Sequence, residues 1–268
     1  MDFDRQERSS QMVKEYPHRA AIEVKNGIVL VGSDFHIWPG TESTALRAFK
    51  KFAKDLQPKA VVLNGDVLDF PQISRHQSIM WESTPFPIEE IEAAQDHLNE
   101  IAMAAPRTSV KCWPLGNHDQ RFETAIANAL PQMRGIKGVH LADNFSVWRK
   151  CWSAWVNDSV VIKHRFKGGI HAPHNNVMWS GRSILTGHLH SQKVTPFTDY
   201  NGTRYGVDTG CVADSDHRAF IAYTEDNPLN WRSGFCVLTF KDGQMLTPEL
   251  VTKWDDKSVQ FRGQIIRV

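Results

Sequence analysis

The stretch that decides the fold is residues 27–38, GIVLVGSDFHIW, which is apolar through Val31 and then places Asp34 and His36 two positions apart. A short apolar run of this kind predicts a buried β-strand. In an extended chain, side chains two residues apart point the same way. If the chain stays extended here, Asp34 and His36 leave the end of the strand in one direction, as two ligands aimed at a single point would.

Further strands and helices follow in alternation. Helical spacing of apolar residues predicts helices, and short apolar runs between them predict strands; the helices are expected at 43–56, 87–106 and 121–130, and the strands at 59–66 and 109–119. This order predicts an α/β layered domain. From about residue 145 several strand-like runs follow one another, at 153–164, 182–190, 204–210, 219–227, 233–250 and 260–268. They predict a second sheet packed on the first, with a hairpin at Asp242–Gly243.

The totals describe an ordinary globular chain of 268 residues, 41% hydrophobic and 23% charged. Without a repeat or a linker, we expect a polar N-terminal arm over residues 1–20 and a single domain over 21–268. The 31 Lys and Arg against 30 Asp and Glu give a net charge of +1, so no global charge calls for nucleic acid or an anionic membrane. The charged N-terminus and the lack of a long apolar run predict a cytoplasmic protein without membrane contact. The four separated cysteines are expected to be reduced thiols.

Polar residues suited to metal binding collect at five strand ends. The seven donors are Asp34, His36, Asp66, Asn117, His164, His188 and His190. Because ligands of α/β proteins gather at the carboxyl ends of strands, the five strand ends are expected to meet in one crevice. Carboxylate, amide and imidazole donors without thiolate suit Mn²⁺, with Fe or Zn²⁺ as alternatives. Seven donors suffice for two ions about 3.5–4 Å apart, which would clamp a phosphate and convert a bound water into a hydroxide nucleophile. Each motif alone is equally explained by an ordinary loop, whereas the ordered set is not.

This ordered set resembles the calcineurin-like metallophosphoesterase superfamily, whose pattern is D-x-H, G-D-x-x-D, G-N-H-[D/E], a lone His and G-H-x-H. Here the motifs read DFH (34–36), GDVLD (65–69), GNHD (116–119), His164 and GHLH (187–190). The resemblance implies a four-layer α/β/β/α sandwich, with two packed mixed sheets flanked by helices. It also implies two divalent metal ions and hydrolysis of a phosphoester.

The resemblance further implies a role for each matching residue. The first metal is assigned Asp34, His36 and His190, the second Asn117, His164 and His188, and Asp66 bridges the two. His118 is assigned to the phosphate, as general acid or charge stabiliser, with Asp119 orienting its ring. Asp69 is expected to support a ligand imidazole.

The lone histidine has alternatives within the same interval, because Arg165 follows His164 where much of the family has glycine. His140, His171 and His174 also lie there; His164 is favoured because it alone closes an apolar run, and His171 is next. Arg165 is a candidate contact for a phosphate oxygen, with an exposed loop arginine as the alternative. His171, Arg75 and His76 are candidate substrate contacts, equally consistent with surface loops.

The motif variants favour one kind of substrate. The acid motif is GNHD rather than GNHE, and no Arg-Gly follows GDVLD, which departs from the Ser/Thr protein phosphatase branch. This favours a phosphodiesterase, either nuclease-like or nucleotide-cleaving, whose partner is a phosphoester such as a nucleic acid or nucleotide. The alternatives are a phosphomonoesterase acting on a small molecule or protein, and a non-catalytic scaffold of the same fold. No feature of the sequence favours a particular oligomeric state.

Overall fold

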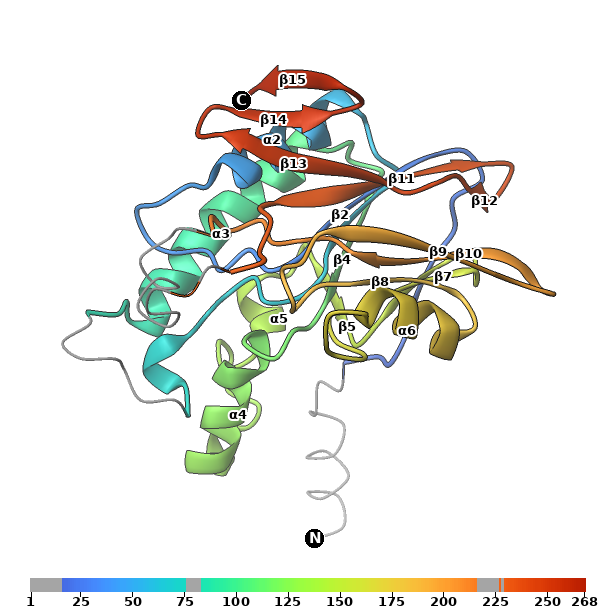
Figure 1. The fold of residues 1–268 in the computed structure, drawn as a ribbon. Coiled ribbons are helices and arrows are strands. Elements are labelled where there is room, and N and C mark those ends of the chain that lie inside the picture. The colour runs from blue at the N-terminus through green and yellow to red at the C-terminus, as the bar shows by residue number, and fades with distance from the viewer. Residues whose placement is uncertain (1–15, 76–82, 216–226, 228) are drawn as a thin grey trace, which may run out of the picture.

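The structure is a computed structural model, and it describes residues 16–75, 83–215, 227 and 229–268 (Figure 1). Most of the expected N-terminal arm lies outside these ranges, as do His76 and nearly all of the strand expected at 219–227. Among the described residues, no helix combines the length and the apolar character that crossing a bilayer requires.

The larger sheet contains nine strands in the described part of the chain. Four neighbouring strands on one side of it, ending at the sheet edge, are parallel, as expected for strands joined by helices. The remaining strands are antiparallel and extend the sheet on its other side. The runs at 233–250 and 260–268 were expected in the second sheet, but they belong to this one, because the strand Gly234–Lys241 pairs with Gly27–Gly32. In spatial order the sheet runs β15 (Gln264–Arg267), β14 (Ser258–Phe261), β13 (Glu249–Asp255), β11 (Gly234–Lys241), β2 (Gly27–Gly32), β3 (Ala60–Leu63), β4 (Val110–Pro114) and β5 (Arg149–Cys151), with β12 (Gln244–Met245) paired to β11.

The smaller sheet is also mixed and contains six described strands. In spatial order these are β1 (Ala20–Ile22), β6 (Ala154–Val156), β7 (Val160–Ile162), β8 (Ser183–Thr186), β10 (Gly202–Asp208) and β9 (Lys193–Asp199). The expected strand at 153–164 is a hairpin, because Asn157 and Asp158 both adopt a φ of 50° and turn the chain between β6 and β7. The expected hairpin at Asp242–Gly243 is confirmed between β11 and β12.

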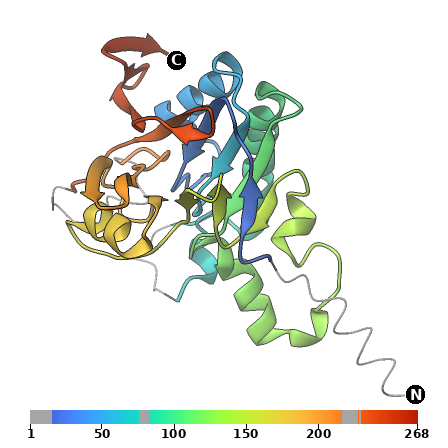
Figure 2. The ribbon, with the colours of Figure 1, turned by 90° about the vertical axis from the view of Figure 1, so that its right-hand side faces the viewer.

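Four layers result from the alternation of side chains along the strands. In β2, Leu30 belongs to the apolar core beneath the helices, whereas Val29 and Val31 belong to the core between the two sheets. Helix α2 (Thr44–Asp55) contacts the larger sheet and α3 (Pro87–Ala104), and α6 (Ala172–Ser180) covers the outer face of the smaller sheet. Figures 1 and 2 show these layers from two sides. The expected α/β/β/α sandwich is confirmed.

The helices follow the sequence signals in most places. The Ser43 hydroxyl accepts the Leu46 N–H at 2.9 Å and so caps α2, and Pro87 opens α3. Helix α4 (Asp119–Ala129) begins two residues before the expected start, at the last residue of GNHD. The short helix α5 (Leu141–Asn144) and two 3₁₀ turns, η1 (Pro71–Ile73) and η2 (Pro131–Met133), complete the described helices. Helix α6 was not expected, because its sequence APHNNVMWS shows no apolar stripe.

Candidate metal centre

The loops that leave β2 and β3 run side by side at the carboxyl edge of the larger sheet. The backbone N–H groups of Asp34, His36 and Ile37 donate to the carbonyls of Gly65, Asp66 and Val67 at 2.9, 3.0 and 2.9 Å. On the other side of the β2 loop, the carbonyls of Ser33 and Asp34 accept the backbone N–H groups of residues 212 and 213. Both loops are therefore fixed by the main chain before any side chain is considered.

The chain is not extended where the sequence argument assumed that it was. Strand β2 ends at Gly32, and Asp34 and His36 have φ values of 55° and 39°, in the left-handed region. The same conformation recurs at Asp66, His188 and His190, with φ of 49°, 72° and 56°. Such residues cost about 1–3 kcal/mol each and persist where the surroundings hold them, commonly at functional sites. The side chains thus converge because the loops turn, and not because strand residues alternate.

The first group of potential metal ligands consists of Asp34, His36 and His190. The fully buried Asp34 directs Oδ1 toward Nε2 of His190 at 3.0 Å and Nε2 of His36 at 4.0 Å. Its Oδ2 accepts the backbone N–H of His188 at 2.8 Å. One carboxylate oxygen is therefore held by the main chain while the other faces the imidazoles.

Asp66, His164 and His188 form the second group. Oδ2 of Asp66 lies 3.0 Å from Nε2 of His164, and Oδ1 accepts the backbone N–H of His118 at 2.8 Å. The Nδ1 atom of His164 lies 2.8 Å from the carbonyl oxygen of Asn64. If Nδ1 carries the proton and donates a hydrogen bond to this carbonyl, Nε2 is left without a proton and directed at Asp66. The groups adjoin, because Nε2 of His164 is also 3.9 Å from Oδ1 of Asp34.

The residues present fit a pair of divalent cations. Asn117 Oδ1 is buried, and none of the described residues donates a hydrogen bond to it. A buried acceptor without a donor is costly unless a ligand or ion satisfies it. Burial lowers the pKa of His164, but Asp66 and Asp34 outweigh this and raise the pKa to about 10. Asp66 and Asp34 therefore favour positive charge at this position, and a metal ion bound to Nε2 would provide it in place of the proton.

Two motif glycines are required by the close approach of the loops. A Cβ on Gly116 would stand 2.1 Å from Oδ1 of Asp66 and 2.3 Å from its backbone nitrogen. Gly65 has a φ of 80°, and a Cβ there would meet the His164 ring at 2.6 Å. Larger residues would displace the carboxylate or the imidazole, so both glycines serve the site directly.

His118 lies beside both groups and is held by Asp69, not by Asp119 as expected. Its Nδ1 is hydrogen-bonded to Oδ1 of Asp69, and its Nε2 lies 3.8 Å from Oδ2 of Asp66. Burial lowers the pKa of His118, but the hydrogen bond to Asp69 and the charges of Asp66 and Asp69 prevail and raise it above its ordinary value. Asp69 Oδ1 is also 3.4 Å from Nδ1 of His36, so the same carboxylate serves an expected metal ligand.

The Asp119 carboxylate organises the loops instead. It accepts the backbone N–H groups of Asp66, Val67, Leu68 and Gly116 and the indole N–H of Trp113. It is completely buried at the start of α4. The correction has a simple cause: the residue after His118 begins a helix, which turns its side chain away from the imidazole and toward the β3 loop.

The substrate-contact candidates stand in different places. Arg165 is exposed next to His164, and its charge acts on His188, whose pKa is lowered by burial, by His164 and by Arg165. His171 is exposed just before α6 and belongs to neither ligand group. Arg75 is exposed, and no described hydrogen bond or ion pair joins it to the site; His76 lies outside the described residues.

The sequence argument missed residues that support the site. Arg121 Nη1 donates to the carbonyl of Asp69 at 2.7 Å, and its Nη2 lies 3.3 Å from Nε2 of His118. Glu90 Oε2 accepts the N–H groups of Asp69 and Phe70 at 3.0 and 2.8 Å. A possible signal for Arg121 was its place two residues after GNHD; nothing in the pattern of α3 distinguished Glu90 from its acidic neighbours.

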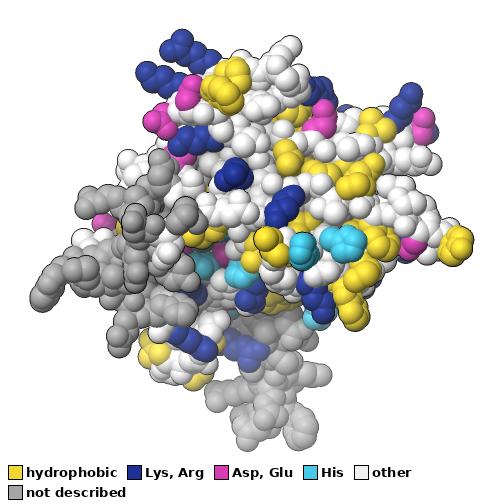
Figure 3. All heavy atoms as spheres, viewed as in Figure 1, with side chains coloured by type: hydrophobic (Ala, Val, Ile, Leu, Met, Phe, Trp, Pro, Cys, Tyr) yellow, Lys and Arg dark blue, Asp and Glu magenta, His cyan; other side chains and the backbone are white. Residues whose placement is uncertain are grey.

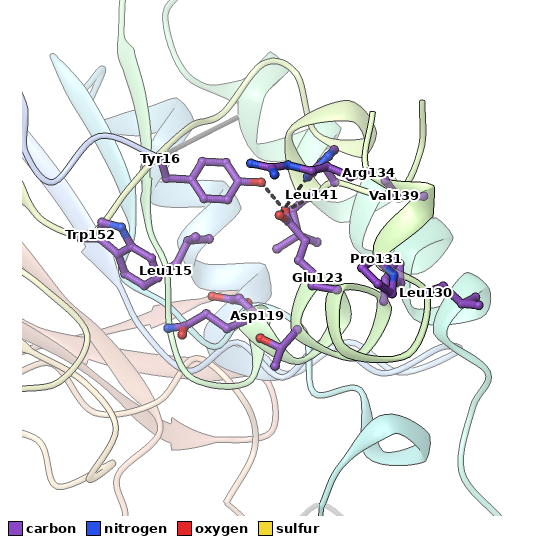
Figure 4. A pocket seen from close by; sticks show the side chains of 15 residues that line it. Tyr16, Leu115, Asp119, Glu123, Leu130, Pro131, Arg134, Val139, Leu141 and Trp152 are labelled. Carbon is purple, nitrogen blue, oxygen red and sulfur yellow. Dashed lines mark hydrogen bonds and ion pairs between the residues drawn. The ribbon is translucent and has the colours of Figure 1, made fainter. Parts of the chain in front are cut away.

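A separate cavity of about 530 Å³ lies along α4. Figure 4 shows Tyr16 and Glu123 pointing toward one another across it, joined by a hydrogen bond, with Trp152 and Leu115 at one side. Glu123 also binds His140 Nδ1 at 3.0 Å, which places that alternative to His164 in this cavity. The lining contains no member of the two ligand groups.

Comparison with known proteins gives matches over most of the chain. A family model described as calcineurin-like phosphoesterase matches residues 28–204. The Gene 54 protein of Mycobacterium phage D29 is 28% identical over 250 residues, 83% of this chain and 92% of that protein; its counterpart in phage L5 is 27% identical over 248 residues with the same coverage. Wild-type Vps29 from Entamoeba histolytica, solved in complex with Zn²⁺, has a TM-score of 0.46 and 15% identity, covering 90% of this chain and 98% of that one. The family match spans every residue of both ligand groups.

Proposed function

The chain belongs to the calcineurin-like phosphoesterase family, and on that premise we propose that it is a binuclear metal-dependent phosphodiesterase. The observation that carries the proposal is the pair of adjoining carboxylate–imidazole groups, with His118 beside them. A structural role alone does not explain five left-handed residues and a buried Asn117 oxygen at one point.

The chain's own residues divide between the two ions. Asp34, His36 and His190 would hold one ion, and Asn117, His164 and His188 the other, with Asp66 between them. Mn²⁺ suits this mixture of oxygen and nitrogen donors, and Fe and Zn²⁺ are alternatives. When bound, such ions polarise the phosphoryl group and provide a nucleophile at neutral pH.

His118 would act on the leaving group. With Nδ1 engaged by Asp69, Nε2 is the ring nitrogen left for a substrate phosphate, and Arg121 Nη2 lies 3.3 Å from it. The raised pKa favours the protonated ring, and the proton would pass from Nε2 to the leaving oxygen as the P–O bond breaks. The Asp69 carboxylate holds the ring in place, and Arg121 limits where Nε2 can point.

The open side of the second group favours a diester over a monoester. His188 is exposed at this side, and the exposed Arg165 acts on it electrostatically. A phosphodiester carries a substituent on each side of the phosphorus, and an exposed edge leaves room for the second one. Two features of the sequence support the same preference: the acid motif is GNHD, and no arginine-glycine pair follows GDVLD.

The test is hydrolysis of bis-p-nitrophenyl phosphate and p-nitrophenyl phosphate, side by side, by metal-stripped protein refilled with Mn²⁺. Asp66→Asn serves as the matched blank, because it removes one charge with little change of shape. We expect diester turnover that the blank lacks. Turnover of the monoester alone would replace the proposal with a phosphatase, and bound metal without turnover of either ester would favour a scaffold.

A further inference from the structure

A segment beside the metal centre has an unusual charge composition. Residues 159–198 contain no Asp or Glu, although the chain has 30 of them, and they contain Lys163, Arg165, Lys167, Arg182 and Lys193. A chain that is nearly neutral overall therefore concentrates positive charge in one segment. The segment includes β7, β8 and α6 and ends within β9.

The structure places much of this segment on one surface. The loop at 165–171 is exposed throughout and leads directly into α6. Large apolar side chains are exposed there as well, with Phe166 at 43%, Trp179 at 66% and Ile170 at 72% of full exposure. In Figure 3, basic, histidine and hydrophobic side chains gather over the region where Figure 1 labels α6. We call Lys163, Arg165, Phe166, Lys167 and Trp179 the 163–179 surface.

Lysines and aromatic rings alternate on this surface. Lys167 Nζ lies 4.7 Å from the ring centre of Trp179 and 5.7 Å from that of Phe166. Lys163 Nζ lies 5.2 Å from the ring centre of Phe166. Each ring is thus bordered by a cation and still open to solvent.

The lysines of this surface contact aromatic rings but are not paired with any described carboxylate. In the described part of the chain, no carboxylate comes within ion-pair distance of Lys163, Arg165 or Lys167. The loop itself is held in place, because Asn176 Oδ1 accepts the N–H of Lys167 at 2.9 Å and Lys193 Nζ donates to the Ile170 carbonyl at 2.9 Å. The surface is therefore shaped in advance and its charge is available to a ligand.

The 163–179 surface is continuous with the metal centre. Arg165 directly follows the buried His164, whose ring centre lies 5.4 Å from that of His188. His188 is exposed, as Arg165 is, so the surface borders the second ligand group at its open side. The surface and the site thus form one path from α6 to the two ligand groups.

We propose that the 163–179 surface binds single-stranded nucleic acid and leads the strand to the metal centre. The identification of this strand as a substrate rests on the phosphodiesterase function proposed above. Phosphates would lie against the lysines and Arg165, and unstacked bases would stack on Phe166 and Trp179. A duplex keeps its bases stacked inside and offers the rings no partner. An anionic membrane would match the charge, but it would not explain the continuity with a phosphoester site.

The test is equilibrium binding of a fluorescein-labelled 20-nucleotide oligothymidylate, measured by anisotropy in Mn²⁺. The protein carries His118→Ala, which retains every expected metal ligand and slows cleavage. Trp179→Ala is compared with Trp254→Ala, a matched control on β13 whose ring is 62% exposed. We expect Trp179→Ala to weaken binding by about tenfold and the control to leave it unchanged. Lys167→Ala should reduce the slope of log Kd against log salt by about 0.7.

Several results would overturn the inference. These are equal effects of the two tryptophan variants, absence of oligonucleotide binding at 50 mM salt, equally tight binding of a duplex, or binding of phosphatidylserine vesicles in place of the oligonucleotide. The binding measurement is independent of turnover. If the wild-type protein fails to hydrolyse bis-p-nitrophenyl phosphate but the oligonucleotide result stands, the proposed function falls and the binding surface remains.

Discussion

At the scale of single residues, the pairing of His118 with Asp69 fixes the imidazole that the proposed reaction would use as its acid. Asp69 is the last residue of GDVLD and reaches Nδ1 of His118, while Asp119, the neighbour in sequence, binds the main chain of another loop. The motifs placed all three residues near the site, but they assigned the His118 ring to Asp119 and Asp69 to a ligand imidazole. Sequence could not decide which carboxylate faces the ring, because that depends on the start of α4 and on the turn at residues 69–70.

Asp69→Asn should lower the kcat for hydrolysis of the dinucleotide TpT by roughly 10- to 100-fold. The effect on bis-p-nitrophenyl phosphate should be smaller, because p-nitrophenolate leaves without full protonation. Asp69 raises the pKa of His118, so its loss lowers that pKa. A general acid works only when protonated, so the alkaline limb of the pH profile should move to lower pH. An unmoved limb, or an equal effect of the exposed control Asp158→Asn, would contradict the pairing.

For the expected ligands, the sequence argument predicted the correct neighbours, but the reason it gave for their proximity was wrong. The structure does bring Asp34 and His36 together, but through left-handed loop residues rather than through an extended strand. Side-chain alternation is a property of regular strands and stops where the strand stops. Loop dihedrals depend on the adjacent loop, and here the β3 exit holds the β2 exit by three main-chain hydrogen bonds.

At the scale of elements, the loops at the sheet edge tolerate little extra volume. Gly116→Ala should push Asp66 from its position and reduce both Mn²⁺ affinity and diester turnover by at least tenfold. Gly168→Ala is the matched control, because a Cβ there meets nothing within 4 Å and its φ is not positive. Mn²⁺ titration and turnover of both variants check this. Equal behaviour of the two would show that the close approach at Gly116 does not matter to the site.

The sequence predicted those elements whose own residue pattern determines their secondary structure. Helices α2 and α3 have apolar stripes and clear end signals, and both were predicted within about two residues. Helix α6 is formed against the smaller sheet, where Val177 packs with Val161 and Ile184. Its two asparagines and scattered apolar residues gave no helical period, so tertiary contacts decide its structure.

Helix α3 stabilises the Asp69 loop through Glu90, and this contact should depend on pH. Burial raises the pKa of Glu90 to about 7, although the N–H groups of Phe70 and Asp69 partly oppose it. The folded protein then binds a proton that the unfolded chain has lost between about pH 4.5 and 7. Stability should therefore fall as pH rises through this window. Between pH 5 and 8 the wild type should lose roughly 2–3 kcal/mol more than Glu90→Gln in urea unfolding. Equal losses would contradict the raised pKa.

At the scale of the whole molecule, the metal centre joins the two halves of the sandwich. Asp34, Asp66 and Asn117 follow strands of the larger sheet, whereas His164, His188 and His190 follow strands of the smaller one. The sequence predicted two sheets, with strand-like runs following one another from about residue 145, and the three histidines do follow strands of the second sheet. It wrongly placed the runs after residue 233 in that sheet, because sequence does not show that β11 pairs with β2. It did not predict the 163–179 surface, because the run without Asp or Glu is visible in the sequence, whereas its exposure and its place beside the ligand groups are not.

Metal binding across the two sheets should stabilise the fold. At an Mn²⁺ concentration 100 times its Kd, the gain is about 2.7 kcal/mol, which corresponds to several degrees in Tm. EDTA should remove this gain from the wild type, and Asp66→Asn should lack it. Glu100→Gln is the control, since its group with Glu42 and His97 already contains the Lys50 ammonium. An Mn²⁺ effect lost in Glu100→Gln and kept in Asp66→Asn would place the metal elsewhere.

The most direct test of a binuclear phosphodiesterase is a titration of metal-stripped protein with Mn²⁺, following bound metal and bis-p-nitrophenyl phosphate turnover in the same samples. The structure predicts that turnover rises with occupancy and reaches its plateau at two Mn²⁺ per chain. Full turnover without added metal, a plateau at one Mn²⁺, or two bound ions without diester turnover would contradict it.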